Sequence, residues 1–218
     1  MEADVHESRS ERVKEVDRIA AFSDGVFAIA ITLLSLQLAV PATRDLGHSL
    51  IDLVPNVFAF VLSFLVIGAF WAAHHRLFAL VRKHDDRLIW LNMAVLFFIV
   101  VIPFTTTVIA SHGGSRLGVL VYALSLVGAG LANVALTAYV LVGRRMCAPS
   151  VPEATVRCSL WLAATSPIVF LSSMVLLLLP IEPSKVTFAW LTIPVVHRLL
   201  KWHYRGAAAQ PAAGRASA

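Results

Sequence analysis

Long, continuous apolar segments restrict the fold of this sequence more than any other feature. Five of them are long, and a sixth is shorter and contains Pro194. A hydrocarbon core about 30 Å thick needs about 20 mostly apolar residues per helix, so each long segment is sufficient to cross a bilayer. The six predicted spans are 19–40, 53–73, 88–110, 117–142, 159–180 and 186–200.

The composition agrees with a membrane protein and disfavours the other classes. Hydrophobic residues make up 58% of the 218 residues, charged residues only 14%, and the mean hydropathy is +0.79. A soluble domain has about 25% charged residues. A membrane β-barrel would show alternating segments of about ten residues, whereas these runs are continuous and rich in Leu, Ala and Val. The sequence therefore predicts an all-α, polytopic membrane protein with six transmembrane helices.

The segments outside the apolar runs are short. Residues 1–17 mix acidic and basic side chains and precede no small-residue cleavage site, so we expect a cytoplasmic helix rather than a cleaved signal peptide. Residues 18–204 then form a single six-helix transmembrane domain. Residues 205–218 are rich in Ala, Gly and Pro, which predicts a disordered cytoplasmic tail.

The positive charges indicate the orientation of the chain. With six spans, all but three of the 18 Lys and Arg residues fall on one side of the membrane. Because Lys and Arg concentrate in cytoplasmic connections, both termini are predicted to be cytoplasmic. The net charge of +5 is thus spread over membrane flanks, and no nucleic-acid partner is expected. The three exceptions are Arg44, Arg116 and Lys185.

One acidic residue, Asp24, lies inside a predicted span. If the first helix enters the membrane near Arg18, Asp24 lies about 9 Å further along the axis, and it must find polar partners there. On a helix it points about 140° away from Ile29, which belongs to an apolar stripe bordered by Thr32 and continued by Leu36. Either Asp24 lines a hydrated path and the stripe packs, or the stripe lines the path and Asp24 is a tether.

Further polar residues are expected at the depth of Asp24. Trp71, His74 and His75 lie near the end of the second span, and Asn92 lies near the start of the third. Together with Ser23 they can form one cluster among three helices. Such a cluster is either a set of interhelical hydrogen bonds or a proton or ion site, and spacing leaves both open. Adjacent histidines diverge by about 100°, so His74 and His75 cannot share a metal ion.

At these residues the sequence resembles a known family. The pattern of Arg18, Phe22, Ser23 and Asp24, followed by an Ile/Leu/Thr-rich helix, is similar to the bacterial members of the transmembrane protein 175 family. The resemblance continues through FWAAHHRLF (70–78), RLIWLN (87–92) and VIPF (101–104), and so covers the first three spans. These proteins are potassium-permeable channels.

The resemblance implies a particular kind of pore. It has no re-entrant filter loop, and the TVGYG filter motif is absent from this sequence. A single six-helix unit would assemble as a homotetramer, with the first helix lining the pore. By position, Ile29 would form the narrowest ring, Thr32 a polar ring and Leu36 a further apolar ring. Arg18 and the Phe-Ser-Asp segment would belong to the polar cluster with Trp71, His74, His75 and Asn92.

The expected function is accordingly a cation channel of the bacterial plasma membrane, weakly to moderately selective for K⁺ among monovalent cations. It would need no cofactor. The alternative is a proton-coupled transporter that uses Asp24. An enzyme is not favoured, because no nucleophile–base pair or metal-ligand set occurs at matched depth.

Overall fold

A computed structural model describes residues 2–38, 53–144, 146–148 and 150–208, with side chains described over the part of these ranges between 14 and 204. The end of the first predicted span, Arg44 and the tail from residue 209 onward lie outside the described residues. Within them the chain is helical, and the single β-type contact is an isolated bridge between Val81 and Cys147.

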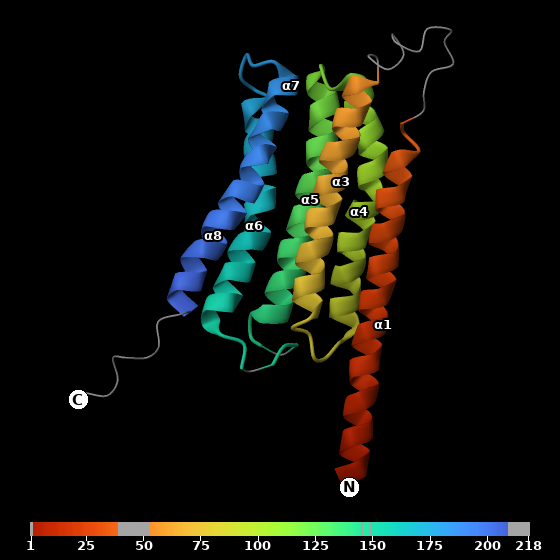
Figure 1. Cartoon of the computed structure of the whole chain (residues 1–218), viewed down its shortest axis with the longest axis vertical. Coiled ribbons are helices and arrows are strands. Elements are labelled where there is room, and N and C mark those ends of the chain that lie inside the picture. Colours follow the sequence, from red (N-terminus) through yellow and green to blue (C-terminus); the bar gives the residue numbers. More distant parts are fainter. Residues whose placement is uncertain (1, 39–52, 145, 149, 209–218) are drawn as a thin grey trace, which may run out of the picture.

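Six long helices run side by side (Figure 1). Two short helical elements, α7 and the 3₁₀ helix η1, precede the last of them. The long helices are α1 (Glu2–Ser35), α3 (Val54–Phe78), α4 (Asp86–His112), α5 (Arg116–Leu141), α6 (Glu153–Leu176) and α8 (Thr192–Ala208). The short elements are α7 (Pro183–Val186) and η1 (Thr187–Leu191).

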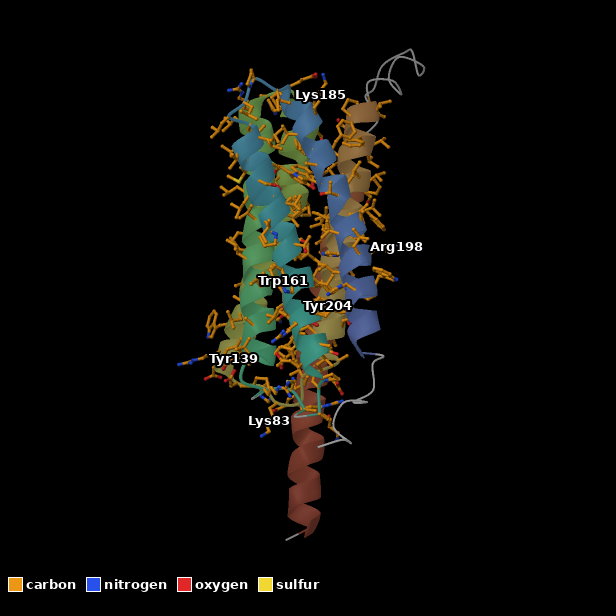
Figure 2. All side chains as sticks on the ribbon, turned by 90° about the vertical axis from the view of Figure 1, so that its left-hand side faces the viewer. Lys83, Tyr139, Trp161, Lys185, Arg198 and Tyr204 are labelled. Carbon is orange, nitrogen blue, oxygen red and sulfur yellow. The ribbon has the colours of Figure 1, made fainter. Side chains whose placement is uncertain are left out.

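The helices α3 to α6 form the centre of the bundle, with α1 at one edge and α8 at the other (Figure 1). Helix α1 packs against α3 and α4, whereas α8 packs against α6. The first turns of α1 extend beyond the bundle. We call the end of the bundle nearest the N-terminus the basic end. It is formed by the α3–α4 and α5–α6 connections, and Lys83 lies there, opposite Lys185 at the other end (Figure 2).

Five helices are long and apolar enough to cross a membrane: α3, α4, α5, α6 and the Lys14–Ser35 part of α1. They coincide with the first five predicted spans to within a few residues, except that the fifth begins earlier, at Glu153. Residues 2–17 continue the same helix rather than forming a separate one. The structure therefore has five apolar helices of membrane-crossing length and one more, α8.

The sixth predicted span, 186–200, is divided differently in the structure. Its first residues belong to α7 and η1, and α8 begins only at Thr192. Pro194 thus lies in the first turn of α8, where the backbone N–H that proline lacks would have no partner inside the helix. Consequently Pro194 marks the beginning of α8.

Glycines allow close packing of α5 against its neighbours. A Cβ atom added to Gly130 would lie 2.8 Å from Cδ and 3.1 Å from the backbone nitrogen of Pro167 on α6. At Gly128 the corresponding atom would lie 2.2 Å from the ring of Phe98 on α4. The phenyl ring can move, but the proline ring and backbone cannot, so the contact at Gly130 is the more restrictive.

We expect Gly130→Ala to lower the thermal unfolding temperature, because α5 and α6 must separate to admit the methyl group. Overpacking of this kind costs about 1–3 kcal/mol. The matched control is Gly68→Ala on α3, where the added Cβ meets nothing within 4 Å and alanine favours the helix. Unfolding followed by tryptophan fluorescence in detergent compares the two. An equal unfolding temperature for both variants would contradict the close approach.

Asp85 stabilises the start of α4 at the basic end. Its Oδ1 accepts a hydrogen bond of 2.9 Å from the backbone N–H of Leu88, and its Oδ2 accepts one from the hydroxyl of Tyr139 on α5. The Tyr139 hydrogen bond is the largest cause that holds the pKa of Asp85 below its ordinary value. The carboxylate therefore both caps α4 and ties it to α5.

We expect Asp85→Ala to cost about 1 kcal/mol at neutral pH, as loss of an N-cap does. Because the pKa of Asp85 is lower in the folded state, its stabilisation is present above the ordinary aspartate pKa and is lost as the pH falls through the folded value. The difference in unfolding temperature between wild type and Asp85→Ala should therefore shrink between pH 7 and about pH 3. A difference that is constant over this range would exclude the charged cap.

Candidate functional site

Helix α1 has two different faces. Ser23, Phe27, Ala30 and Leu34 are buried against α3 and α4, with exposed fractions of 1% or less. The opposite face is open: Ile29 is 61% exposed and Leu36 is 74% exposed in the single chain. Thr32 lies on this open face and is also exposed. The residues of each face recur every three or four positions along the chain, as they do on an α-helix with one buried side.

The buried face of α1 carries a chain of polar contacts to α3 and α4. The Ser23 hydroxyl donates to the Ile19 carbonyl at 2.9 Å, and Asn92 Nδ2 donates to Ser23 Oγ at 2.9 Å. The remaining amide oxygen of Asn92 lies 2.7 Å from His74 Nε2. Since a carbonyl oxygen only accepts, Nε2 of His74 is the donor. Ser23, His74 and Asn92 are each at most 1% exposed.

The Asp24 side chain makes a separate contact. Its Oδ1 accepts a hydrogen bond of 2.8 Å from Nε1 of Trp71 on α3. Among the described residues neither histidine hydrogen-bonds to Asp24, so the polar residues form two groups and not one. His75 is exposed and lies against Trp71, with ring centroids 5.6 Å apart.

Aromatic side chains surround His74 and explain why it, and not His75, faces inward. The ring of His74 stacks on Phe78 at 4.3 Å and lies 5.5 Å from Phe27. Ile67, Phe70 and Leu77 share this buried face of α3. The helical spacing of these residues from His74 was a signal that the sequence already contained.

Two other residues of the predicted motif lie away from these contacts. Arg18 is exposed and has no ion pair or hydrogen bond within the described part of the chain. Phe22 is 55% exposed and lies on the open face of α1 with Ile29. The structure thus forms two hydrogen-bonded groups across α1, α3 and α4: Ser23–Asn92–His74 and Asp24–Trp71. Neither Arg18 nor Phe22 belongs to them.

A second polar network, which the sequence does not predict, lies further along the bundle among α3, α4 and α5. Ser63 Oγ is 2.8 Å from the hydroxyl of Tyr122 and 2.8 Å from Oγ1 of Thr106. Thr105 Oγ1 lies 2.9 Å from Ser125 Oγ. These contacts join α3, α4 and α5. Serines and threonines scattered on three helices give no recognisable spacing, so only the packed bundle reveals that they meet.

The hydroxyl of Thr32 is oriented by its own helix. It donates to the carbonyl of Ile29 at 2.9 Å, and the Ser35 hydroxyl donates in turn to the carbonyl of Thr32 at 2.7 Å. With its proton engaged, the Thr32 oxygen presents its lone pairs to the open face. Such an oxygen is suited to contact a cation. No three His, Cys, Asp or Glu side chains of the described residues lie close enough to hold a metal ion.

A bundle of apolar helices with buried polar networks and one open helix face defines an integral membrane protein. A family sequence model described as the endosomal/lysosomal potassium channel TMEM175 matches residues 18–103, the region that contains the second half of α1, all of α3 and most of α4. Over these residues the chain is similar to the TMEM175 family, which is a family of ion channels and not of enzymes.

Individual relatives show the same similarity. A potassium channel of Streptomyces collinus is 41% identical over 131 residues, which are 57% of this chain and 64% of that protein. The chicken endosomal/lysosomal proton channel TMEM175 is 30% identical over 126 residues, or 56% of this chain and 25% of the relative. The chain therefore matches less than two thirds of the length of either.

A solved structure covers more of the fold. The crystal structure of a TMEM175 homologue from Chamaesiphon minutus, described as a potassium-selective channel, superposes with a TM-score of 0.71 at 29% identity. The superposition covers 88% of this chain and 98% of that one. The likeness thus extends to the later helices, where the family sequence model does not reach.

Proposed function

We propose that this protein is a potassium-permeable cation channel whose pore is lined by the open face of α1. The observation that carries the proposal is the position of α1 at the edge of the bundle, with Ile29, Thr32 and Leu36 turned away from α3 and α4. Several copies around an axis would bring these faces together. We propose a homotetramer, in which four Ile29 side chains form the narrowest ring.

The residues of the open face account for gating and selectivity in this proposal. Four Ile29 side chains that crowd the axis exclude water, and a small rotation or tilt of α1 would rehydrate the pore. The oriented oxygen of Thr32 would replace a few hydration contacts of a passing cation. Hydroxyl rings without a carbonyl-lined filter favour K⁺ over Na⁺ only weakly to moderately, and other monovalent cations would also pass.

The polar contacts of α1 would set the direction of the pore face. Ser23 is held by Asn92 and Asp24 by Trp71, in directions about 100° apart around the helix, and rotation of α1 would break both contacts. We propose that these bonds anchor the helix while Leu36 and Ile29 remain free of the bundle. The Phe-Ser-Asp segment is then a support for the pore and not its lining.

We propose a location in a bacterial plasma membrane, supported by the bacterial potassium channel among the relatives. In this arrangement α8 is the sixth span and residues 18–204 form the membrane domain. Residues 1–17 and the tail 205–218 are cytoplasmic, since the basic end carries the connections rich in Lys and Arg.

Reconstitution tests the channel. We expect the purified full chain, shown to be tetrameric by light scattering, to pass K⁺ into liposomes down a gradient, with a smaller flux of Na⁺. Folded tetramer that passes no cation would overturn the proposal. Protein-free liposomes and liposomes that contain heat-unfolded protein are the controls.

A second candidate is movement of protons through Asp24, a titratable carboxyl group in the membrane. The vertebrate relative bears the name proton channel, which supports testing it here. The Trp71–Asp24 hydrogen bond offers a way to separate a tether from a proton carrier. A tether needs both partners, whereas a proton carrier needs only the carboxyl group.

We expect Asp24→Ala and Trp71→Phe to weaken the tetramer to a similar extent, and the double variant to add little, because all remove the same bond. Size-exclusion chromatography measures the loss of tetramer. Pyranine fluorescence in liposomes measures proton uptake in parallel. If only the Asp24 variant abolished proton uptake, while both variants stayed tetrameric, Asp24 would be a proton carrier and the tether would be refuted.

A further inference from the structure

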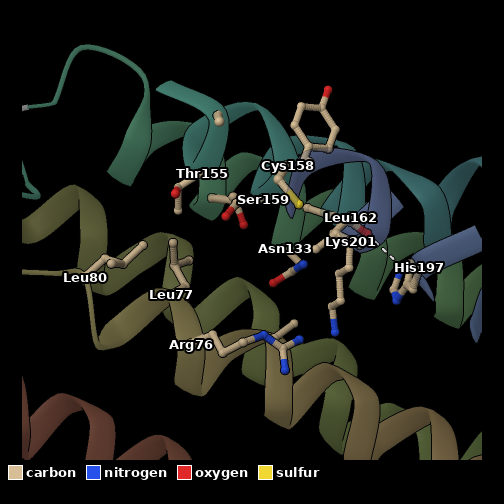
Figure 3. A pocket seen from close by; sticks show the side chains of 15 residues that line it. Arg76, Leu77, Leu80, Asn133, Thr155, Cys158, Ser159, Leu162, His197 and Lys201 are labelled. Atoms are coloured by element: carbon tan, nitrogen blue, oxygen red, sulfur yellow. Dashed lines mark hydrogen bonds between the residues drawn. The ribbon is translucent and has the colours of Figure 1, made fainter. Parts of the chain in front are cut away.

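A cavity of about 410 Å³ lies between α3, α5, α6 and α8 near the basic end (Figure 3). No residue of α1 lines it. The cavity is therefore separate from the proposed pore face, and nothing in the channel mechanism makes use of it. Its size is within the range of small-molecule binding sites, about 300–1,000 Å³.

Two cationic side chains enter this cavity from opposite walls. Arg76 comes from α3 and Lys201 from α8, and Figure 3 shows both side chains directed into the space between the helices. No Asp or Glu lines the cavity, and within the described residues neither cation has an ion-pair partner. Arg76 is exposed and Lys201 is half-buried in the single chain, and two like charges at one site favour an anion between them.

A buried amide faces the same space. Asn133 of α5 is only 5% exposed, lines the cavity and has no hydrogen-bond partner among the described residues. Figure 3 shows its amide group beside the side chains of Arg76 and Lys201. Because no described residue hydrogen-bonds to this amide, its donor and acceptor are available to a polar ligand in the cavity.

Helix α8 turns polar residues inward here. His197, Lys201 and Tyr204 line the cavity at helical spacing, with His197 Nε2 3.1 Å from the carbonyl oxygen of Leu162. Leu199 and Trp202 face outward and are 59% and 77% exposed. This is the reverse of a helix at an aqueous surface, and it gives the cavity a polar wall on the side of α8.

The first turn of α6 adds to the positive potential. Ala154 and Thr155 line the cavity, and the beginning of a helix favours an anion. The nearby carboxylate of Glu153 does not compete, because it pairs outside the cavity with Arg144 at 2.8 Å and Arg157 at 3.4 Å. Donors thus converge from α3, α5 and α8, and the beginning of α6 faces the same space.

We propose that this cavity binds the phosphate group of an anionic ligand through Arg76, Lys201 and Asn133. Donors that converge from several directions suit a tetrahedral oxyanion better than a planar carboxylate. Basic pockets between membrane helices on the cytoplasmic side commonly receive lipid headgroups. The apolar walls, including Leu77 and Leu162, suit the adjoining part of a phospholipid, but a free phosphate shares the same recognised group.

Two arms distinguish these sources with the purified full chain in detergent. In the first, native mass spectrometry counts bound dioleoyl-phosphatidylglycerol against dioleoyl-phosphatidylcholine. In the second, thermal unfolding is followed with added inorganic phosphate or chloride. We expect phosphatidylglycerol to be retained about tenfold more than phosphatidylcholine. Stabilisation by phosphate alone would also support the site and would assign it to a soluble ligand.

Variants connect the binding to the cavity. We expect Arg76→Gln and Lys201→Gln to reduce it several-fold, and the matched control Arg198→Gln to leave it unchanged, since Arg198 points away from the bundle (Figure 2). Asn133→Asp is the strongest test: it preserves side-chain size and places a carboxylate beside both cations, so a folded variant should lose binding. If neither ligand's binding depends on these residues, the proposal is overturned. The result is independent of whether α1 lines a pore.

Discussion

Replacing Ile29 with asparagine is expected to raise the cation flux of the reconstituted protein roughly tenfold, which corresponds to about 1.4 kcal/mol of barrier. Ile29 is 61% exposed in the single chain, and in the proposed tetramer four copies meet at the axis. A ring of amides would keep the constriction hydrated where a ring of isoleucines excludes water. Single-channel recording in planar bilayers measures the change.

Two controls belong with this experiment. Ile29→Leu preserves an apolar ring and should keep the flux near that of the wild type. Val100→Asn places the same amide at an exposed position of α4, 51% accessible, outside the proposed pore. If Ile29 faced lipid, Ile29→Asn and Val100→Asn would behave alike. That outcome would remove Ile29 from the constriction.

Replacing Asn92 with alanine is expected to detach α1 from the bundle. Asn92 is 1% exposed and joins His74 of α3 to Ser23 of α1, so its loss leaves both partners without that hydrogen bond. Interhelical hydrogen bonds in membranes contribute about 0.6–2 kcal/mol each, which gives an expected loss of about 1–4 kcal/mol for the two. Thermal unfolding in detergent and the yield of tetramer on size-exclusion chromatography measure the effect.

The neighbouring residue provides the matched control. Met93 is 40% exposed on the same turn of α4, and Met93→Ala removes a side chain without breaking any of these hydrogen bonds. We expect it to unfold close to the wild-type temperature. If Asn92→Ala unfolded at the same temperature as Met93→Ala and remained tetrameric, the Ser23–Asn92–His74 contacts would not anchor α1.

Some features of the site could be foreseen because helical periodicity is local. The opposition of Asp24 to Ile29 follows from their spacing alone, and the structure places them on different sides of α1. The similar depth of Asn92 and His74 in the membrane could also be predicted, because one lies near the start of an apolar run and the other near the end of the preceding run. Which histidine faces inward was not predicted, although the spacing of Phe70 and Phe78 from His74 indicates it; in the structure His74 packs against Phe27 and Phe78.

Other features depended on contacts between distant parts of the chain. The Ser63–Tyr122–Thr106 network and the cavity lined by Arg76, Asn133 and Lys201 each combine helices far apart in sequence. The apolar runs do not predict which helices pack against one another. The pairing of Asp24 with Trp71, and not with a histidine, is of the same kind.

The sequence by itself determined that this protein is a helical membrane protein, because the length and continuity of apolar runs respond directly to the thickness of a bilayer. It also determined which residues share a face of α1, because side-chain direction repeats along a helix. Only the tertiary structure decided which face of α1 is buried, which polar groups are paired, and where cations remain unpaired around a cavity. Those outcomes depend on how the helices pack against one another, and packing joins residues that no local pattern relates.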